Sequence, residues 1–485
     1  MKKFKLYIMA MVATILFVPS VMAAEITAGT DEELKNAFST AASGDTIKLT
    51  ADITHVGGSS SLMVQGGKTI TIDLNGKTLT VDPTSESNRS IVVNGGTLNV
   101  KGGTIKAEKS SAINVWGSET AATDFSVLNV DKDVILKGNT GIGIFYDVNN
   151  AYGVKVNFAG TIEAEANGIT INGKVQHENG PVINIEETAV IEATGEEGVG
   201  IYAAGNGTWN IKEGAEITGA TALGIKAGVF NIEGGTFTGT GAYVDNPELY
   251  GNGINPSGSA IQIETNSGYY GEVQLNITGG TFVSENGNVI TEYGSDNDTA
   301  VDSITIEGGE FIAAEGKDVV AVSEGLAKAQ ESTDVVSIEG GVFLGNVDES
   351  LLDEDTIKVT FAAVVDGEIY NMDEVVGTIV VAKGYNFDNE DKEALEELIG
   401  EEFDGYVFDG FYTSEDLKTK LDLDKALNED TTIYMNYVKL TKKEETVKNE
   451  EPPKTGDMNL LLVLGSIVFG GAGIIVTRKK LAKNN

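Results

Sequence analysis

The chain has 485 residues, enough for two or three domains, and it contains 60 glycines, only 7 prolines and no cysteine. Its formal net charge of −39 argues against a nucleic-acid-binding surface, which requires clustered cations. Many glycines with few prolines indicate tight turns in a regular structure, and without disulfide bonds its stability must come from packing.

The first 23 residues predict a signal peptide. Three lysines precede an apolar stretch from Leu6 to Val18, and small residues follow it. Cleavage is expected after Ala23, with Ala24 as the alternative site. Residues 1–23 are therefore excluded from the fold, and we expect the mature chain to be exported.

A short helix is predicted next. Thr30 and Glu33 form a capping box, and Gly44 is expected to end the helix. Its apolar face consists of Leu34, Ala37, Phe38 and Ala41. Strand-like segments follow at 45–49 and 70–77. We expect this helix to cover the open end of the fold that those strands begin, because an uncovered strand edge invites aggregation.

One short pattern then recurs. It alternates apolar, polar and apolar residues, which is the period of a strand with one buried face. The polar position is Asn in seven copies, Thr305 in one and Ser337 in another. The nine copies begin at Leu98, Leu128, Val156, Ile183, Trp209, Phe230, Leu275, Ile304 and Val336. Their mean period of about 30 residues is typical of a solenoid, propeller or array.

A second short strand follows most copies, and glycines stand at the corners. These strands are expected at 112–115, 141–144, 168–171, 198–201, 224–227 and 260–263. Two or three short strands per coil with glycine-rich corners describe a parallel β-helix. A propeller is the alternative, but its blades need about 40 residues and antiparallel hairpins. We therefore expect a mainly β protein with a right-handed parallel β-helix, a solenoid, over residues 24–352.

The run from Asp73 to Leu79 and the Gly-Gly-Thr-Phe repeats resemble the pectate-lyase-like β-helix of bacterial surface proteins over residues 25–350. This resemblance implies a fold more than a function. In a stacked solenoid, equivalent Asn side chains stand about 4.8 Å apart and can form a hydrogen-bonded ladder. The alternative is a flat polar strip that binds a glycan.

Pectate lyases and polygalacturonases share this fold, so catalysis must be considered. Arg89 is the only arginine between the signal peptide and the tail, and we interpret it as a surface loop residue. His55 and His177 are interpreted as loop histidines rather than bases. The sequence thus predicts no catalytic residue, no cofactor and no cofactor-binding residue.

Four glutamates are assigned to one repeat position beside a corner. They are Glu213, Glu233, Glu307 and Glu339. A divalent cation could bridge stacked carboxylates. Other copies carry Lys101, Asp131 and Thr278 there, so a solvated face is expected and no metal ligand is predicted.

The repeat stops near Leu351, and residues 353–440 predict a second, small domain. Strands are expected at 357–365, 375–382, 405–413 and 430–437, with a helix at 388–400. The segment is similar to the Listeria–Bacteroides repeat, the β-grasp-like module of internalin B-type surface proteins. Phe411 and Tyr437 stand where that family usually has Trp. These aromatic residues are expected in a core rather than in a ligand site.

Residues 441–451 predict a charged linker, and 452–485 a three-part tail. The tail begins with the motif Pro452, Pro453, Lys454, Thr455 and Gly456. An apolar run at 460–476, at the short end of what spans a bilayer, and several cations follow. This tail resembles the sorting signal of Gram-positive surface proteins, in which a sortase cuts between Thr and Gly and joins the Thr to peptidoglycan.

The usual first residue of that motif is Leu, and the form with Pro452 is similar to the variant that some clostridial-type sortases recognise. The resemblance implies sortase and peptidoglycan as partners, a cell-wall location, and only transient contact with the membrane through the tail. An ordinary C-terminal membrane anchor is the alternative.

Two functions are considered. The first is a non-catalytic, wall-anchored surface protein whose rod serves adhesion or display, with a host or extracellular glycan or protein as ligand. The alternative is a wall-anchored polysaccharide lyase or glycoside hydrolase of the β-helix fold. The insertion between Thr240 and Ser259 is the expected contact site, since extra loop length on a solenoid usually serves binding; a plain spacer loop is the alternative.

Overall fold

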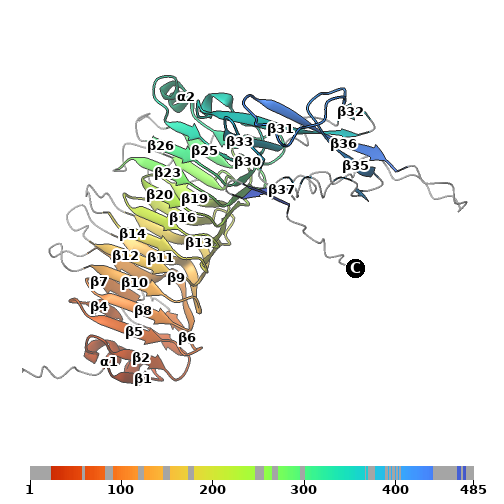
Figure 1. Cartoon of the computed structure of the whole chain (residues 1–485). Coiled ribbons are helices and arrows are strands. Elements are labelled where there is room, and N and C mark those ends of the chain that lie inside the picture. Colours follow the sequence, from red (N-terminus) through yellow and green to blue (C-terminus); the bar gives the residue numbers. More distant parts are fainter. Residues whose placement is uncertain are drawn as a thin grey trace, which may run out of the picture.

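Most of the described strands are short and pair in parallel with their neighbours (Figure 1). The computed structural model describes residues 23–56, 61–81, 91–117, 125–145, 153–172, 180–245, 256–264, 271–294, 301–365, 367–369, 377–387, 392, 395, 399, 402–403, 406–440, 467–470 and 473–476. Strand follows strand around each coil, and equivalent strands of successive coils lie side by side.

The first column of strands forms one continuous parallel sheet, here called the ladder sheet. Its twelve strands are β1 (Glu25–Ala28), β2 (Thr46–Leu49), β5 (Thr69–Asp73), β8 (Thr97–Lys101), β10 (Ser126–Val130), β12 (Val154–Phe158), β14 (Val182–Ile185), β17 (Thr208–Ile211), β20 (Gly228–Ile232), β23 (Val273–Ile277), β26 (Val301–Ile306) and β29 (Val336–Ile338). Eight of the nine predicted repeat copies begin inside one of these strands, and the ninth begins at the first residue of β29.

The second and third columns complete each coil. The second contains β3 (Ile53–His55), β6 (Thr78–Val81), β15 (Val190–Ala193), β18 (Glu216–Gly219), β21 (Thr236–Gly239), β24 (Thr281–Ser284), β27 (Glu310–Ile312) and β30 (Gly341–Leu344). The third contains β4 (Met63–Gln65), β7 (Ile91–Asn94), β16 (Val199–Ala204), β19 (Thr221–Ile225), β22 (Ile261–Glu264), β25 (Ile290–Tyr293) and β28 (Val320–Ala321). Three long strands pass through both columns: β9 (Gly103–Trp116), β11 (Val134–Phe145) and β13 (Thr161–Asn172).

Side chains along each strand point alternately into the coil and out of it. Leu98 and Val100 are fully buried inside, whereas Asn99 between them faces outward and is only partly buried. Stacking of equivalent coils also stacks their interior rings, with centroids 4.7 to 5.2 Å apart along Phe237, Phe282, Phe311 and Phe343. The prediction of a parallel β-helix rather than a propeller is therefore confirmed, with three strands in a coil.

Helix α1 (Asp31–Thr40) packs against the first strands and buries Leu34 and Phe38. Thr30 is its N-cap, as predicted, and accepts a hydrogen bond from the Glu33 amide, while the Glu33 carboxylate accepts one from the Gly29 amide. The predicted end at Gly44 is wrong. The helix stops at Thr40 because the Asp45 carboxylate accepts the Ala42 amide at 2.8 Å and closes a separate turn.

A mixed sheet follows the last coil, after α2 (Glu324–Gln330) and the 3-10 turn Glu349–Leu351. Its main strands run in the order β33 (Gly377–Ala382), β31 (Thr356–Val365), β36 (Thr431–Lys439) and β35 (Tyr406–Tyr412). The short strands β32 (Glu368–Ile369) and β34 (Glu402–Phe403) pair at its margin. Strand β33 also pairs antiparallel with β30, so this sheet is joined by hydrogen bonds to the final coil and projects sideways from it (Figure 1).

The core of this sheet contains the aromatic residues that were expected there from the sequence. Phe411 and Tyr437 are buried and both pack near Phe408. Most of the expected helix at 388–400 lies outside the described residues. Within it Leu395 is fully buried as expected, but Ile399 is 51% exposed, so its placement on the apolar face is wrong.

The end of the chain is described only at β37 (Ile467–Gly470) and β38 (Gly473–Val476), which pair antiparallel. Among the described residues, no helix has the length and apolar composition needed to cross a membrane. The charged linker 441–451 and the motif from Pro452 to Gly456 lie outside the described residues.

Candidate functional site

The outer face of the ladder sheet carries an unbroken row of asparagine side chains. Each Nδ2 donates a hydrogen bond to Oδ1 of the asparagine on the preceding coil, at distances of 2.6 to 3.0 Å. The row consists of Asn99, Asn129, Asn157, Asn184, Asn210, Asn231 and Asn276, and Asn99 continues it to the Thr71 hydroxyl at 3.2 Å. The predicted ladder is confirmed.

The ladder leaves hydrogen-bonding capacity on its outer side. An amide group has two N–H donors and an acceptor oxygen with two lone pairs, and the ladder uses one donor and one acceptor position of each inner member. The remaining positions repeat at the strand spacing of about 4.8 Å. The ladder and the glycan-binding strip that the sequence offered as alternatives are therefore compatible on this face.

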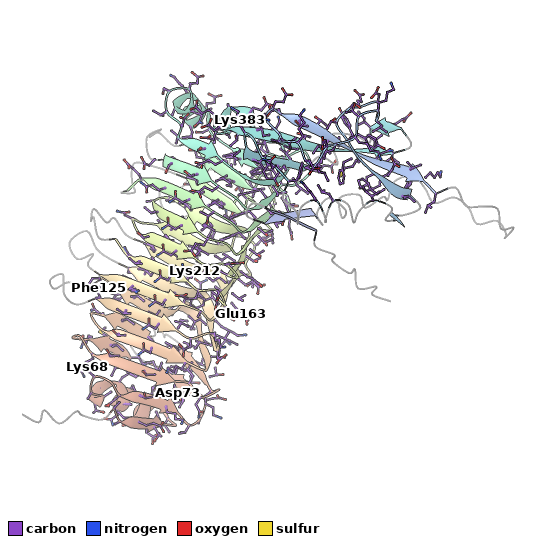
Figure 2. All side chains as sticks on the ribbon, viewed as in Figure 1. Lys68, Asp73, Phe125, Glu163, Lys212 and Lys383 are labelled. Carbon is purple, nitrogen blue, oxygen red and sulfur yellow. The ribbon has the colours of Figure 1, made fainter. Side chains whose placement is uncertain are left out.

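A groove of about 790 Å³ runs along the corner beside the ladder. Its lining consists of Asp131, Lys132, Asp133, Ala159, Glu186, Glu187, Thr188, Lys212, Glu213 and Glu233. Lys212, labelled in Figure 2, lies about halfway along the stack of coils. With six carboxylates and two lysines the groove favours cationic or neutral ligands over anionic polysaccharides.

The register corrects one assignment made from the sequence. Because Ile211 pairs with Ile232, the residue opposite Glu233 is Lys212 and not Glu213. The Lys212 amine lies 2.5 Å from Oε1 of Glu233, so an ion pair links these two coils. The column therefore mixes charges of both signs.

The groove does not hold its carboxylates in the surroundings that acid catalysis requires. Five of the six are exposed and Glu186 is half-buried. The general acid of a glycoside hydrolase needs an apolar environment that keeps it protonated. Among the described residues there is also no cluster of three His, Asp or Glu side chains arranged to hold a metal ion.

His55 does not lie in a loop, and that expectation is wrong. It ends β3 with its side chain fully buried, and its Nδ1 lies 2.5 Å from Oδ1 of Asp31 in the first turn of α1. It therefore joins the helix to the first coils. Arg89 and His177 lie outside the described residues.

Hydrogen bonds attach the described ends of the insertion between Thr240 and Ser259 to the third column. Ser259 Oγ lies 2.7 Å from the Thr291 hydroxyl, and the Ser257 amide donates to Gln262 at 3.0 Å. Tyr293 donates a hydrogen bond to the Val244 carbonyl at 3.0 Å. Most of the predicted contact loop itself lies outside the described residues.

Sequence reasoning missed one group in this region. Lys226 and Glu264 form an ion pair whose side chains are 0% and 1% exposed. Their separation of 38 residues in the chain gave no local signal, because the segments between strands of the third column vary in length. The pair becomes visible only in the register of β19 and β22.

The predicted cleavage site lies at the start of the described structure. The Ala24 amide donates a hydrogen bond to Asp45 at 2.8 Å, and β1 begins at Glu25. Cleavage after Ala23 would keep this donor, as an amino group, and cleavage after Ala24 would remove it.

No protein-family model, no curated protein and no solved structure matches this chain.

Proposed function

We propose that the chain is a non-catalytic surface protein that a sortase joins to peptidoglycan, and that its β-helix serves adhesion or display. The signal sequence and the tail motif from Pro452 to Gly456 support export and anchoring. In this proposal the coils wind right-handed, α1 caps the first coil, and residues 353–440 form a β-grasp-like module beside the tail. Contact with the membrane is transient and is made by the apolar segment alone.

The asparagine ladder is the observation that carries the binding role. It presents a straight, regular row of donors and acceptors over seven coils, held in place by its own hydrogen bonds. A row of this kind suits an extended polymer better than a compact small molecule. The ligand of this proposal is a host or extracellular glycan, neutral or amino-bearing because of the acidic groove beside the ladder.

Binding to defined polysaccharides tests this role. The exported chain, immobilised, should retain neutral or amino-bearing polymers and not pectin. Asn184→Ala, at the centre of the ladder, should weaken retention several-fold, whereas Ser337→Ala should leave it unchanged because its hydroxyl donates to Glu339 outside the ladder. Equal retention by both variants would exclude the ladder as the binding face.

A second function is kept because of the groove with six carboxylates. It is a wall-anchored polysaccharide lyase or glycoside hydrolase. Incubation of the same polymers with the exported chain and calcium should give no new reducing ends and no unsaturated products. Products that disappear in a single variant such as Glu186→Gln would establish the enzyme instead.

Anchoring is tested in the producing cells. The protein should be found in the peptidoglycan fraction, leave it after muramidase digestion, and end at Thr455. Release of intact protein by detergent, with Lys483 still present, would support the ordinary membrane anchor.

A further inference from the structure

Lys226 and Glu264 occupy matching positions on adjacent coils. Lys226 follows β19 and Glu264 ends β22, and these parallel strands pair through Ile225 and Ile263. The two side chains are therefore cross-strand neighbours, with Nζ 2.5 Å from Oε1. Both are almost completely shielded from solvent. Neither the ladder nor the groove uses them.

Burial favours the uncharged forms of both groups. It lowers the pKa of the Lys226 amine and raises the pKa of the Glu264 carboxyl, although their mutual hydrogen bond and attraction act in the opposite direction. An uncharged amine is a nucleophile, and an undissociated carboxyl group is the electrophile that it can attack. Within the described part of the chain, Oε2 of Glu264 has no hydrogen-bond partner.

We propose that Lys226 and Glu264 condense to an isopeptide bond. The bond from Nζ to Cδ forms while a bond from Cδ to oxygen breaks, and the departing hydroxyl takes one hydrogen from Nζ and leaves as water. No oxidant, reductant or cofactor enters the balance. The product is a neutral amide, which removes the desolvation cost of two buried ions, and the exclusion of water protects it from hydrolysis.

The position of this cross-link gives it a structural role. Between Lys226 and Glu264 the chain makes one turn of the solenoid through β20 and β21, and this turn includes the insertion between Thr240 and Ser259. A solenoid is held by contacts between neighbouring coils, so the interface interrupted by a long insertion is where two coils can separate. A covalent bond closes that stretch in a chain that has no cysteine for a disulfide bond.

Tryptic digestion of the denatured, full-length protein followed by mass spectrometry tests the proposal. Trypsin cuts after lysine only when the amine is free, and no Lys or Arg lies between Lys226 and Lys317. The isopeptide bond predicts one uncut peptide, 213–317, lighter than its sequence by one water. Two peptides, 213–226 and 227–317, both of full mass, would show an ordinary ion pair and overturn the proposal.

A solvated pair of the same geometry provides the internal control. Lys137 and Glu163 are cross-strand neighbours of β11 and β13 at 2.6 Å, but each side chain is 40% exposed. Cleavage after Lys137 should be complete in the same digest. Glu163 is labelled at the side of the rod in Figure 2.

Two variants extend the test, the first read by the same digest and the second by thermal melting. Glu264→Met keeps the Lys226 amine but removes the carboxyl, so cleavage after Lys226 should return. The double variant Lys226→Met/Glu264→Met removes both ionisable groups of the pair. It should melt below the wild-type protein if a covalent bond has been lost, whereas an unchanged or higher Tm would mean that only an ion pair was present.

Discussion

Asp31 and Asp45 hold the first turns of the described structure through their carboxylates. Partial burial acts to raise the pKa of Asp31, but the hydrogen bonds and charges of His55 and Lys35 outweigh it and the pKa is lowered. Hydrogen bonds from the Ala24 and Ala42 amides lower the pKa of Asp45. Both groups are thus better stabilised as carboxylates in the folded chain than in the unfolded one.

This difference predicts acid sensitivity at the N-terminal end. A lowered folded pKa contributes stability that is present above the ordinary value of 3.8 and is lost as pH falls through the folded value. Protease cleavage before β5 should therefore increase on acidification between about pH 5 and pH 2. Asp31→Asn should flatten the pH dependence, and Glu216→Gln, at an exposed position in β18, should not. The same slope in both variants would contradict this origin.

At the scale of elements, α1 is the helix that we propose to cap the first coil. Its buried face comprises Leu34, Ala37 and Phe38, and the helix contacts β1, β2 and β3. This face belongs to the same buried apolar cluster as Ile47 and Leu49 of β2, which are fully buried. We propose that the helix takes the place that a preceding coil would occupy.

Phe38→Asp should open this end. A charge placed among apolar side chains without a partner costs about 3 kcal/mol or more. We expect aggregation and proteolytic cleavage within residues 24–56, measured by light scattering and mass spectrometry. Asn36→Asp adds the same charge at an exposed position of the same helix and is the matched control. Unchanged melting and no new cleavage in Phe38→Asp would show that the helix does not protect the first coil.

The strands and the ladder could be predicted because their signals are local. Side chains alternate between the two faces of a strand, so an Asn between two buried apolar residues must face outward. The corners could not be predicted in the same way. Six positions separate Ile211 from Ile217, but five separate the equivalent Ile232 and Phe237. Because of that extra corner residue, Lys212 rather than Glu213 lies in register with Glu233.

Sites made by the third column depend on the register of strands whose connections differ in length. The pair of Lys226 and Glu264 is separated by 38 residues, whereas Lys212 and Glu233 in the ladder sheet are separated by 21. No single repeat length in the sequence brings the two residues of both pairs into register. The groove was also missed, because its lining combines ladder-sheet residues with corner residues of several coils.

For the whole molecule, the repeat predicts that one coil can be removed. Ile183 and Trp209 are equivalent, so deletion of residues 183–208 joins Val182 to Trp209 and keeps every later side chain on its face. The rod should shorten by about 4.8 Å and stay folded, since solenoid stability is nearly a sum over neighbouring coils. Small-angle scattering measures the length of the rod, and circular dichroism measures whether it stays folded.

Deletion of residues 183–207 is the control for that experiment. It is one residue shorter, places Thr208 at the inward position of Ile183 and turns Trp209 outward. This variant should lose its cooperative melting. Equal folding of the two deletions would mean that register between coils does not hold the rod together.

The order of strands beyond the last coil determines how the chain responds to tension. Strand β31 enters this sheet and β36 leaves it, and the two run parallel as direct neighbours over seven residue pairs from Val359 and Thr431 to Val365 and Tyr437. A pull between the rod and the C-terminal end draws these strands in opposite directions along their length. Their hydrogen bonds are then loaded in shear and must break together, rather than one after another as in unzipping. The sheet beside the proposed anchor is thus built as a mechanical clamp.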